Sequence, residues 1–137
     1  MSSPPSARIG ALTIMAARPR ELGRFYSRLL NWPYIREEEP GPDDPPDAGY
    51  ALVCPPDGVV EPALNFDYQT NHRRPQWPTV AGEQTSTMHL DVTVDDLDTA
   101  VASAIECGAT VADLQPRPTQ HRVIIDPEGH PICLCLP

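Results

Sequence analysis

The sequence predicts an α+β fold of two tandem strand-helix-strand-strand-strand (βαβββ) modules, with mixed sheets and both helices outside them. Two observations carry this prediction. A strand followed by an amphipathic helix occurs twice, at residues 9–30 and at residues 88–107. An apolar strand that ends in a Pro-acid-Gly turn also occurs twice, as ALVCPPDG (51–58) and VIIDPEG (123–129). The repeat period of about 70–80 residues indicates a tandem duplication.

The first module is expected at about residues 8–69. IGALTIM (9–15) predicts its first strand. The helix begins at Pro19, a favoured first helical residue, and ends near Leu30. The apolar side chains of this helix recur at helical spacing, at Leu22, Phe25, Tyr26, Leu29 and Leu30.

Two further strands are expected before the module ends with ALNFDYQ (63–69). Trp32-Pro33-Tyr34 leads into a strand that fades into EEEPGPDDPPD (37–47). This acidic segment holds six acids, four prolines and no large apolar side chain. It is therefore predicted to be a mobile loop, because it has little to bury in return for being ordered.

The second module is expected at about residues 88–137. Its first strand, Met88 to Val94, alternates apolar and polar side chains, which indicates a half-buried strand. Asp95 is the expected N-cap of the helix that follows, Asp98 lies in its first turn, and Gly108 ends it. The helical apolar residues are Leu97, Ala100, Val101, Ala104 and Ile105. HRVIIDPEGHPICLCLP (121–137) predicts two strands joined by a tight turn, which end the module.

Residues 70–87 carry no clear period and are expected to connect the two modules, so that residues 1–137 form a single domain. We call this segment the connector. A loop of this length often has a function or contacts a partner. His72, which lies in the connector beside two arginines, is expected to be a solvated loop residue. His130, which follows the DPEG turn of the second module, is expected to be a surface turn residue.

The segments FYSRLLNW, MHLDVTVDDLDTAVASAIECGATV and DPEGHPICL resemble the vicinal oxygen chelate superfamily, which includes glyoxalase I, extradiol dioxygenases and bleomycin-resistance proteins. The resemblance covers nearly the whole chain. It implies that each module curls its sheet into half of a cup, with a ligand cavity between the halves. It does not select one reaction, because this scaffold hosts many chemistries.

Metal-dependent members of the superfamily hold a divalent ion with four residues, two His or Gln and two Glu, from the first and last strands of each module. The matching positions here are His89 and Cys133 in the second module. In the first module they are Ala11, which has no donor atom, and either Asp67 or Asn65, depending on strand register. No metal or other cofactor is therefore favoured, although His89, Asp67 and Cys133 could hold a divalent ion such as zinc.

Two functions remain open. The first is a metal-independent protein that binds a small organic molecule in the cup. The second is an enzyme, a lyase, isomerase or dioxygenase, with a degenerate metal site or a metal-free acid-base mechanism that uses His89 and Asp67. The expected ligand-binding residues are His89, Asp91, Asp67, Asn65, Thr13, Ala11 and Cys133.

Composition limits the partners and the cellular location that we expect for the protein. A net charge of −9 argues against nucleic-acid and anionic-membrane partners. The four cysteines lack a disulfide-framework spacing, so free thiols are expected, and MSSPPSAR has no signal-peptide pattern. We expect a cytoplasmic protein, and a homodimer because members of the superfamily often pair.

Overall fold

The computed structural model describes residues 3–137 and confirms the predicted α+β architecture. Module one contains β1 (Ala11–Ala16), α1 (Pro19–Leu30), β2 (Tyr34–Glu38), β3 (Tyr50–Cys54) and β4 (Ala63–Tyr68). Module two contains β5 (Leu90–Thr93), α2 (Leu97–Cys107), β6 (Thr110–Val111), β7 (His121–Ile125) and β8 (Pro131–Cys135).

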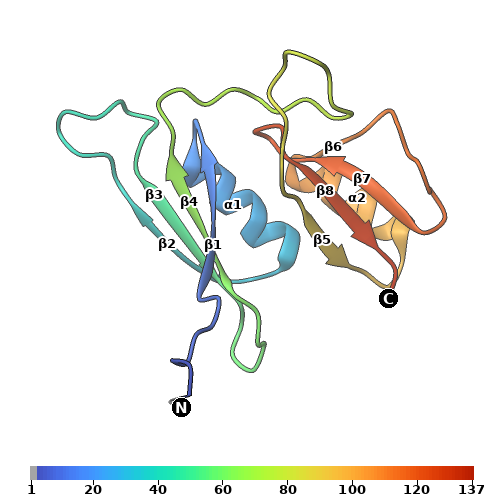
Figure 1. Ribbon diagram of the computed structural model, residues 1–137, viewed down its shortest axis with the longest axis horizontal. Helices are drawn as coiled ribbons and strands as arrows, with labels where there is room; N and C mark the ends of the chain where they lie inside the picture. The colour runs from blue at the N-terminus through green and yellow to red at the C-terminus, as the bar shows by residue number, and fades with distance from the viewer. Residues whose placement is uncertain (1–2) are drawn as a thin grey trace.

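Each module forms its own four-stranded mixed sheet. The strand orders are β1-β4-β3-β2 and β5-β8-β7-β6. In each sheet the first and last strands of the module pair in parallel, and the other pairs are antiparallel. The sheets stand side by side with α1 and α2 behind them, and the connector crosses from one to the other (Figure 1). This arrangement confirms the predicted tandem βαβββ fold with a cup-like layout.

Helix α1 lies at the centre of the core. Its Phe25 and Tyr26 are almost completely buried, and the Tyr26 ring stacks on Phe66 of β4 at a centroid distance of 5.3 Å. The same helix reaches the second module, because the Arg28 guanidinium donates to the Cys107 carbonyl at the end of α2, at 3.0 Å. Neither helix of the described chain combines the length and hydropathy needed to cross a bilayer.

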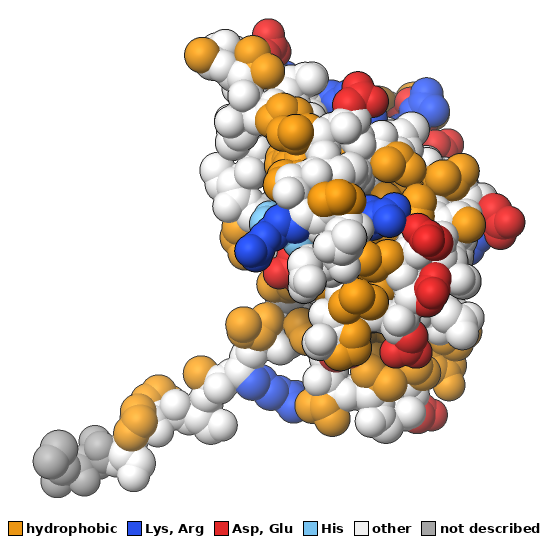
Figure 2. Space-filling model, turned by 90° about the vertical axis from the view of Figure 1, so that its right-hand side faces the viewer, with side chains coloured by type: hydrophobic (Ala, Val, Ile, Leu, Met, Phe, Trp, Pro, Cys, Tyr) orange, Lys and Arg blue, Asp and Glu red, His pale blue; other side chains and the backbone are white. Residues whose placement is uncertain are grey.

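Strands β1 and β5 both begin two residues later than the sequence predicts. β5 pairs with β8 only from Leu90, and Met88 before it is 77% exposed. In each sheet the partner strand offers a proline at this point, Pro131 in β8 and Pro62 just before β4, and proline has no N–H for the ladder. The chain before β1 extends away from the body of the molecule (Figures 1 and 2).

The acidic segment 37–47 is hydrogen-bonded to α1 in the structure, and its mobility stays a prediction. Its first two residues belong to β2. The Arg20 guanidinium then donates to the carbonyls of Pro46 and Ala48, at 2.8 and 3.2 Å, and to the Glu39 carboxylate at 2.9 Å. These charge-assisted hydrogen bonds do not appear in the local apolar pattern from which mobility was predicted.

The N-cap of α2 is Asp96 and not Asp95, so that prediction is wrong by one residue. The Asp96 carboxylate accepts a hydrogen bond from the Thr99 backbone N–H at 2.8 Å, and this bond lowers the pKa of the carboxyl group. A lowered pKa in the folded state means that the cap contributes stability above the unfolded pKa and loses it as the pH falls through the folded pKa.

We therefore expect Asp96→Ala to lower the melting temperature at neutral pH, and the difference from wild type to shrink in acid as the carboxyl group protonates. Asp95→Ala is the matched control and should leave the melting temperature almost unchanged. Thermal unfolding followed by circular dichroism at several pH values measures both. An equal loss in the two variants would contradict the capping assignment.

Candidate functional site

The strand register decides which residue of β4 corresponds to Cys133. Thr13 pairs with Asn65, and Asp91 pairs with Cys133. Thr13 and Asp91 occupy equivalent positions in the first strands of the two modules. Asn65 is therefore the counterpart of Cys133, and Asp67 lies further along β4.

Asn65 is engaged within its own sheet. The Tyr50 hydroxyl donates to its Oδ1 at 2.7 Å, and its Nδ2 donates to Thr13 Oγ1 at 3.5 Å. The amide is thus oriented by two neighbours on the open face of the first sheet. A side chain already bonded in this way is less available as a metal ligand or proton carrier.

His89, Asp91 and Cys133 form a cluster on the second sheet. One potential ligand atom from each lies within 4.8 Å of the other two. His89 Nε2 is 3.1 Å from Asp91 Oδ1, and both side chains are about half exposed or more. Burial, the Asp91 charge and Cys135 raise the pKa of the Cys133 thiol, which therefore stays protonated at neutral pH. Asp67 is not part of this cluster.

The metal set that the superfamily resemblance implies does not fit the residues present. Of the four positions, Ala11 offers no donor atom, Asn65 is hydrogen-bonded within its sheet, and Cys133 carries a protonated thiol. Only His89 keeps the expected ligand type. Hard divalent ions prefer carboxylate and imidazole ligands, and neither carboxylate of the usual set remains.

A cavity of about 340 Å³ lies between the modules, and we call it the inter-module cavity. Three of the residues singled out from the sequence line it, namely Ala11, Thr13 and His89. Tyr26 and His130 also line it, and neither was expected there. Its volume is in the range of small-molecule sites.

The other expected ligand-binding residues lie outside this cavity. Asn65, Asp67 and Cys133 do not line it. Asp91 borders a neighbouring hollow of about 480 Å³ near Trp32, which shares Leu12 and Leu90 with the cavity. A third hollow, of about 420 Å³, lies beneath the connector. It shares Thr13, Ile14, Met88 and His130 with the inter-module cavity, so the two spaces meet at these residues.

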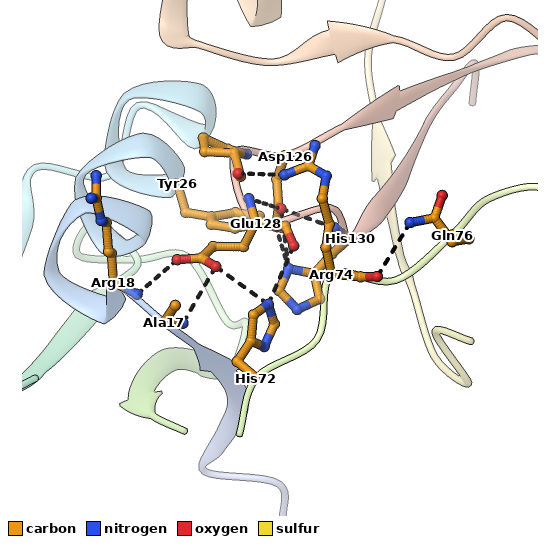
Figure 3. Close-up of polar contacts among 10 residues, drawn as sticks. Ala17, Arg18, Tyr26, His72, Arg74, Gln76, Asp126, Glu128 and His130 are labelled. Carbon is orange, nitrogen blue, oxygen red and sulfur yellow. Dashed lines mark hydrogen bonds and ion pairs between the residues drawn. The ribbon is translucent and has the colours of Figure 1, made fainter. Parts of the chain in front are cut away.

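Behind the inter-module cavity, the buried carboxylate of Asp126 collects four donors (Figure 3). The Tyr26 hydroxyl donates to Oδ2 at 2.7 Å, and His130 Nδ1 lies 2.8 Å from the same oxygen. The backbone N–H groups of Glu128 and His130 donate to Oδ1 at 2.8 and 3.0 Å. Burial and the neighbouring Asp126 charge raise the pKa of Tyr26 well above its usual value, so the phenol remains a donor. We call these groups the Asp126 network.

A second carboxylate in the same turn binds the connector and the start of α1. Glu128 accepts hydrogen bonds from the backbone N–H groups of Ala17 and Arg18, at 3.3 and 2.7 Å. His72 Nε2 lies 3.3 Å from its Oε2, and both side chains are only 11% exposed. The His72 ring also lies 5.8 Å from that of His130. The prediction that His72 is a solvated loop residue is therefore wrong.

The prediction that His130 is a surface turn residue is also wrong, because its side chain is 19% exposed and paired with Asp126. The sequence contained two signals for this network. Tyr26 puts a hydroxyl on an otherwise apolar helix stripe, and Asp126 puts a carboxylate directly after an apolar strand. Buried polar groups of this kind need partners. The helix stripe and the DPEG turn explain both residues as parts of the fold, so these patterns alone do not predict the network.

Tyr26→Phe removes one donor from the buried Asp126 carboxylate. We expect the free energy of unfolding to fall by about 1–3 kcal/mol, because hydrogen bonds to buried charged groups are worth that much. Urea unfolding measures the change. Tyr34→Phe removes a hydroxyl from a half-exposed ring on β2 and should cost less than about 0.5 kcal/mol. Similar values for the two variants would argue against the Asp126 network as a stabilising unit.

Comparison with known proteins gives a family match that agrees with the fold described above. A family model described as a glyoxalase-like domain matches residues 11–135. Among curated proteins, none matches the chain.

Solved structures share the fold at low sequence identity. A glyoxalase family protein from Enterococcus faecalis is 19% identical, with a TM-score of 0.62, over 93% of this chain and 96% of its own. A glyoxalase/bleomycin resistance protein/dioxygenase family enzyme from Burkholderia phytofirmans PsJN is 17% identical, with a TM-score of 0.61, over 95% and 98%. TnmS3, an antibiotic binding protein from Streptomyces sp. CB03234, is 18% identical, with a TM-score of 0.57, over 96% and 97%.

Proposed function

Because the chain belongs to the glyoxalase-like family, we propose that it binds a small organic molecule in the inter-module cavity, without the family's full metal site. The observation that carries this proposal is the cavity itself, about 340 Å³ between β1 and the start of β5. Apolar side chains form most of its walls, and Thr13, His89 and His130 add a few polar groups. Small-molecule sites usually combine these two features.

Ala11 supports the same proposal. It stands where a metal-dependent relative would carry a ligand side chain, and the missing atoms leave space on the cavity wall. His89 at the opposite wall is half exposed and can reach a bound molecule. The antibiotic-binding neighbour TnmS3 has the same fold, so a small-molecule binding role is consistent with this architecture.

An enzyme is the second candidate, and the ion-paired His89 and Asp91 are the observation that favours it. A paired imidazole can act as a general base, and a divalent ion could use the His89, Asp91 and Cys133 cluster. The expected His89–Asp67 pair gains no support, since Asp91 is the carboxylate beside His89. Metal analysis of protein purified without a histidine tag separates the candidates, because a stoichiometric divalent ion would favour the enzyme.

The binding proposal is tested by filling the cavity. A panel of aromatic and heterocyclic compounds is screened by thermal shift, and the best compound is titrated by calorimetry. Ala11→Leu should weaken its binding by about tenfold or more, because the larger side chain occupies the ligand volume. Ala63→Leu is the matched control, since Ala63 pairs with Ala11 on the same sheet but does not line the cavity. Equal affinity of Ala11→Leu and wild type would place the site elsewhere.

A further inference from the structure

His130 presents one ring nitrogen to the protein and the other to open space. Its Nδ1 lies 2.8 Å from Asp126 Oδ2, but its Nε2 has no hydrogen-bond partner within residues 3–137. Every buried side-chain nitrogen or oxygen in that range has a partner. Nε2 is therefore accessible, and His130 lines both the inter-module cavity and the hollow beneath the connector.

The Asp126 network determines which nitrogen carries the proton. A carboxylate only accepts hydrogen bonds, so the Nδ1 beside Asp126 must be the protonated nitrogen. The Tyr26 hydroxyl donates its proton to the same Asp126 oxygen, so it is not the group that accepts the proton of the His130 ring. In the neutral ring this leaves a lone pair on Nε2, directed away from Asp126.

The cavity walls around His130 indicate what kind of ligand group would contact this lone pair. Leu12, Ile14, Leu90 and Pro131 line the same cavity and are apolar. A planar ring can pack against such side chains and exclude water, and a hydroxyl on that ring would find an acceptor at Nε2. A molecule with a weakly acidic hydroxyl on an apolar, unsaturated frame combines both properties.

We propose that His130, oriented by Asp126, is the proton acceptor of the inter-module cavity, and that the ligand class is a phenol or enol whose hydroxyl donates to Nε2. This rests on the proposed binding function and adds a ligand chemistry to it. When the proton moves, the ligand O–H bond breaks and an Nε2–H bond forms. The electron pair stays on the ligand oxygen as a phenolate or enolate, and the Asp126 carboxylate compensates the imidazolium.

Other charges around His130 are compatible with this role. From α1 it faces Tyr26, which stays neutral, and from the connector it faces His72, whose own Nε2 is paired with Glu128. Arg74 donates to the Pro127 carbonyl in the same turn, at 2.8 Å. Asp126 is thus the carboxylate that contacts the ring, and it acts as a positioning residue.

His89 is less suited to this task, although it lines the same cavity. Its side chain is 49% exposed, compared with 19% for His130, so water competes more for its ring. Its Nε2 is also occupied by Asp91 at 3.1 Å. His130 is therefore the better-suited proton acceptor of the two histidines that line the cavity.

p-Nitrophenol is a suitable probe, because its ionised form absorbs visible light and its neutral form does not. Equilibrium dialysis gives its affinity, and absorbance across pH gives the ionised fraction of the bound probe. Bound to wild-type protein, the probe should ionise at a lower pH than when free. His130→Asn keeps a donor toward Asp126 but removes Nε2. It should bind the probe about tenfold more weakly and abolish the shift in ionisation.

The control is His121→Asn, on β7 and away from the cavity, which should match wild type. One outcome would overturn this inference and leave the binding function standing. In it, Ala11→Leu blocks probe binding, but His130→Asn changes neither the affinity nor the ionisation of the bound probe. If His130→Asn does not fold, the wild-type titration decides, and a bound probe that ionises like the free phenol overturns the inference. Absence of saturable binding also overturns it, while the wider compound panel still tests the binding function.

Discussion

One buried carboxylate, Asp126, links the two modules. It lies at the end of β7, and its oxygens take donors from its own turn and from Tyr26, which belongs to α1 of the first module. A buried carboxylate requires hydrogen-bond donors, and removing one of these four costs stability. This requirement fixes α1 against the β7–β8 turn, and with it the space between β1 and β5. Glu128 strengthens the link by accepting the N–H groups before α1.

The sequence was sufficient for the architecture because periodicity and turn chemistry are local. The bounds of α1 and the glycine that ends α2 follow from apolar spacing and end signals, and the structure has both. The starts of β1 and β5 depend on Pro62, just before β4, and Pro131, in β8, which lie far along the chain from the strands they limit. The docked segment 37–47 depends on Arg20. Local patterns carry no information on such distant partners.

The site was predictable only in part, for the same reason. Strand alternation and the module repeat predicted that Ala11, Thr13 and His89 face the space between the modules. The structure places all three on the wall of one cavity. The choice between Asn65 and Asp67 needed the strand register, because a shift along β4 exchanges one for the other. His72 and His130 were misjudged, because His72 meets Glu128 across 56 residues of chain and no spacing rule covers such a pair.

The protonation state of His130 tests the central claim most directly, because it reports the contact with Asp126 and the free nitrogen at once. Long-range ¹H–¹⁵N correlation spectra of ¹⁵N-labelled protein distinguish the two neutral forms of each histidine ring. The account predicts that the neutral His130 ring carries its proton on Nδ1 and leaves Nε2 unprotonated, in a resonance assigned by comparison with His130→Asn. A ring protonated on Nε2 alone would contradict the account, because Asp126 would then face a nitrogen that cannot donate to it.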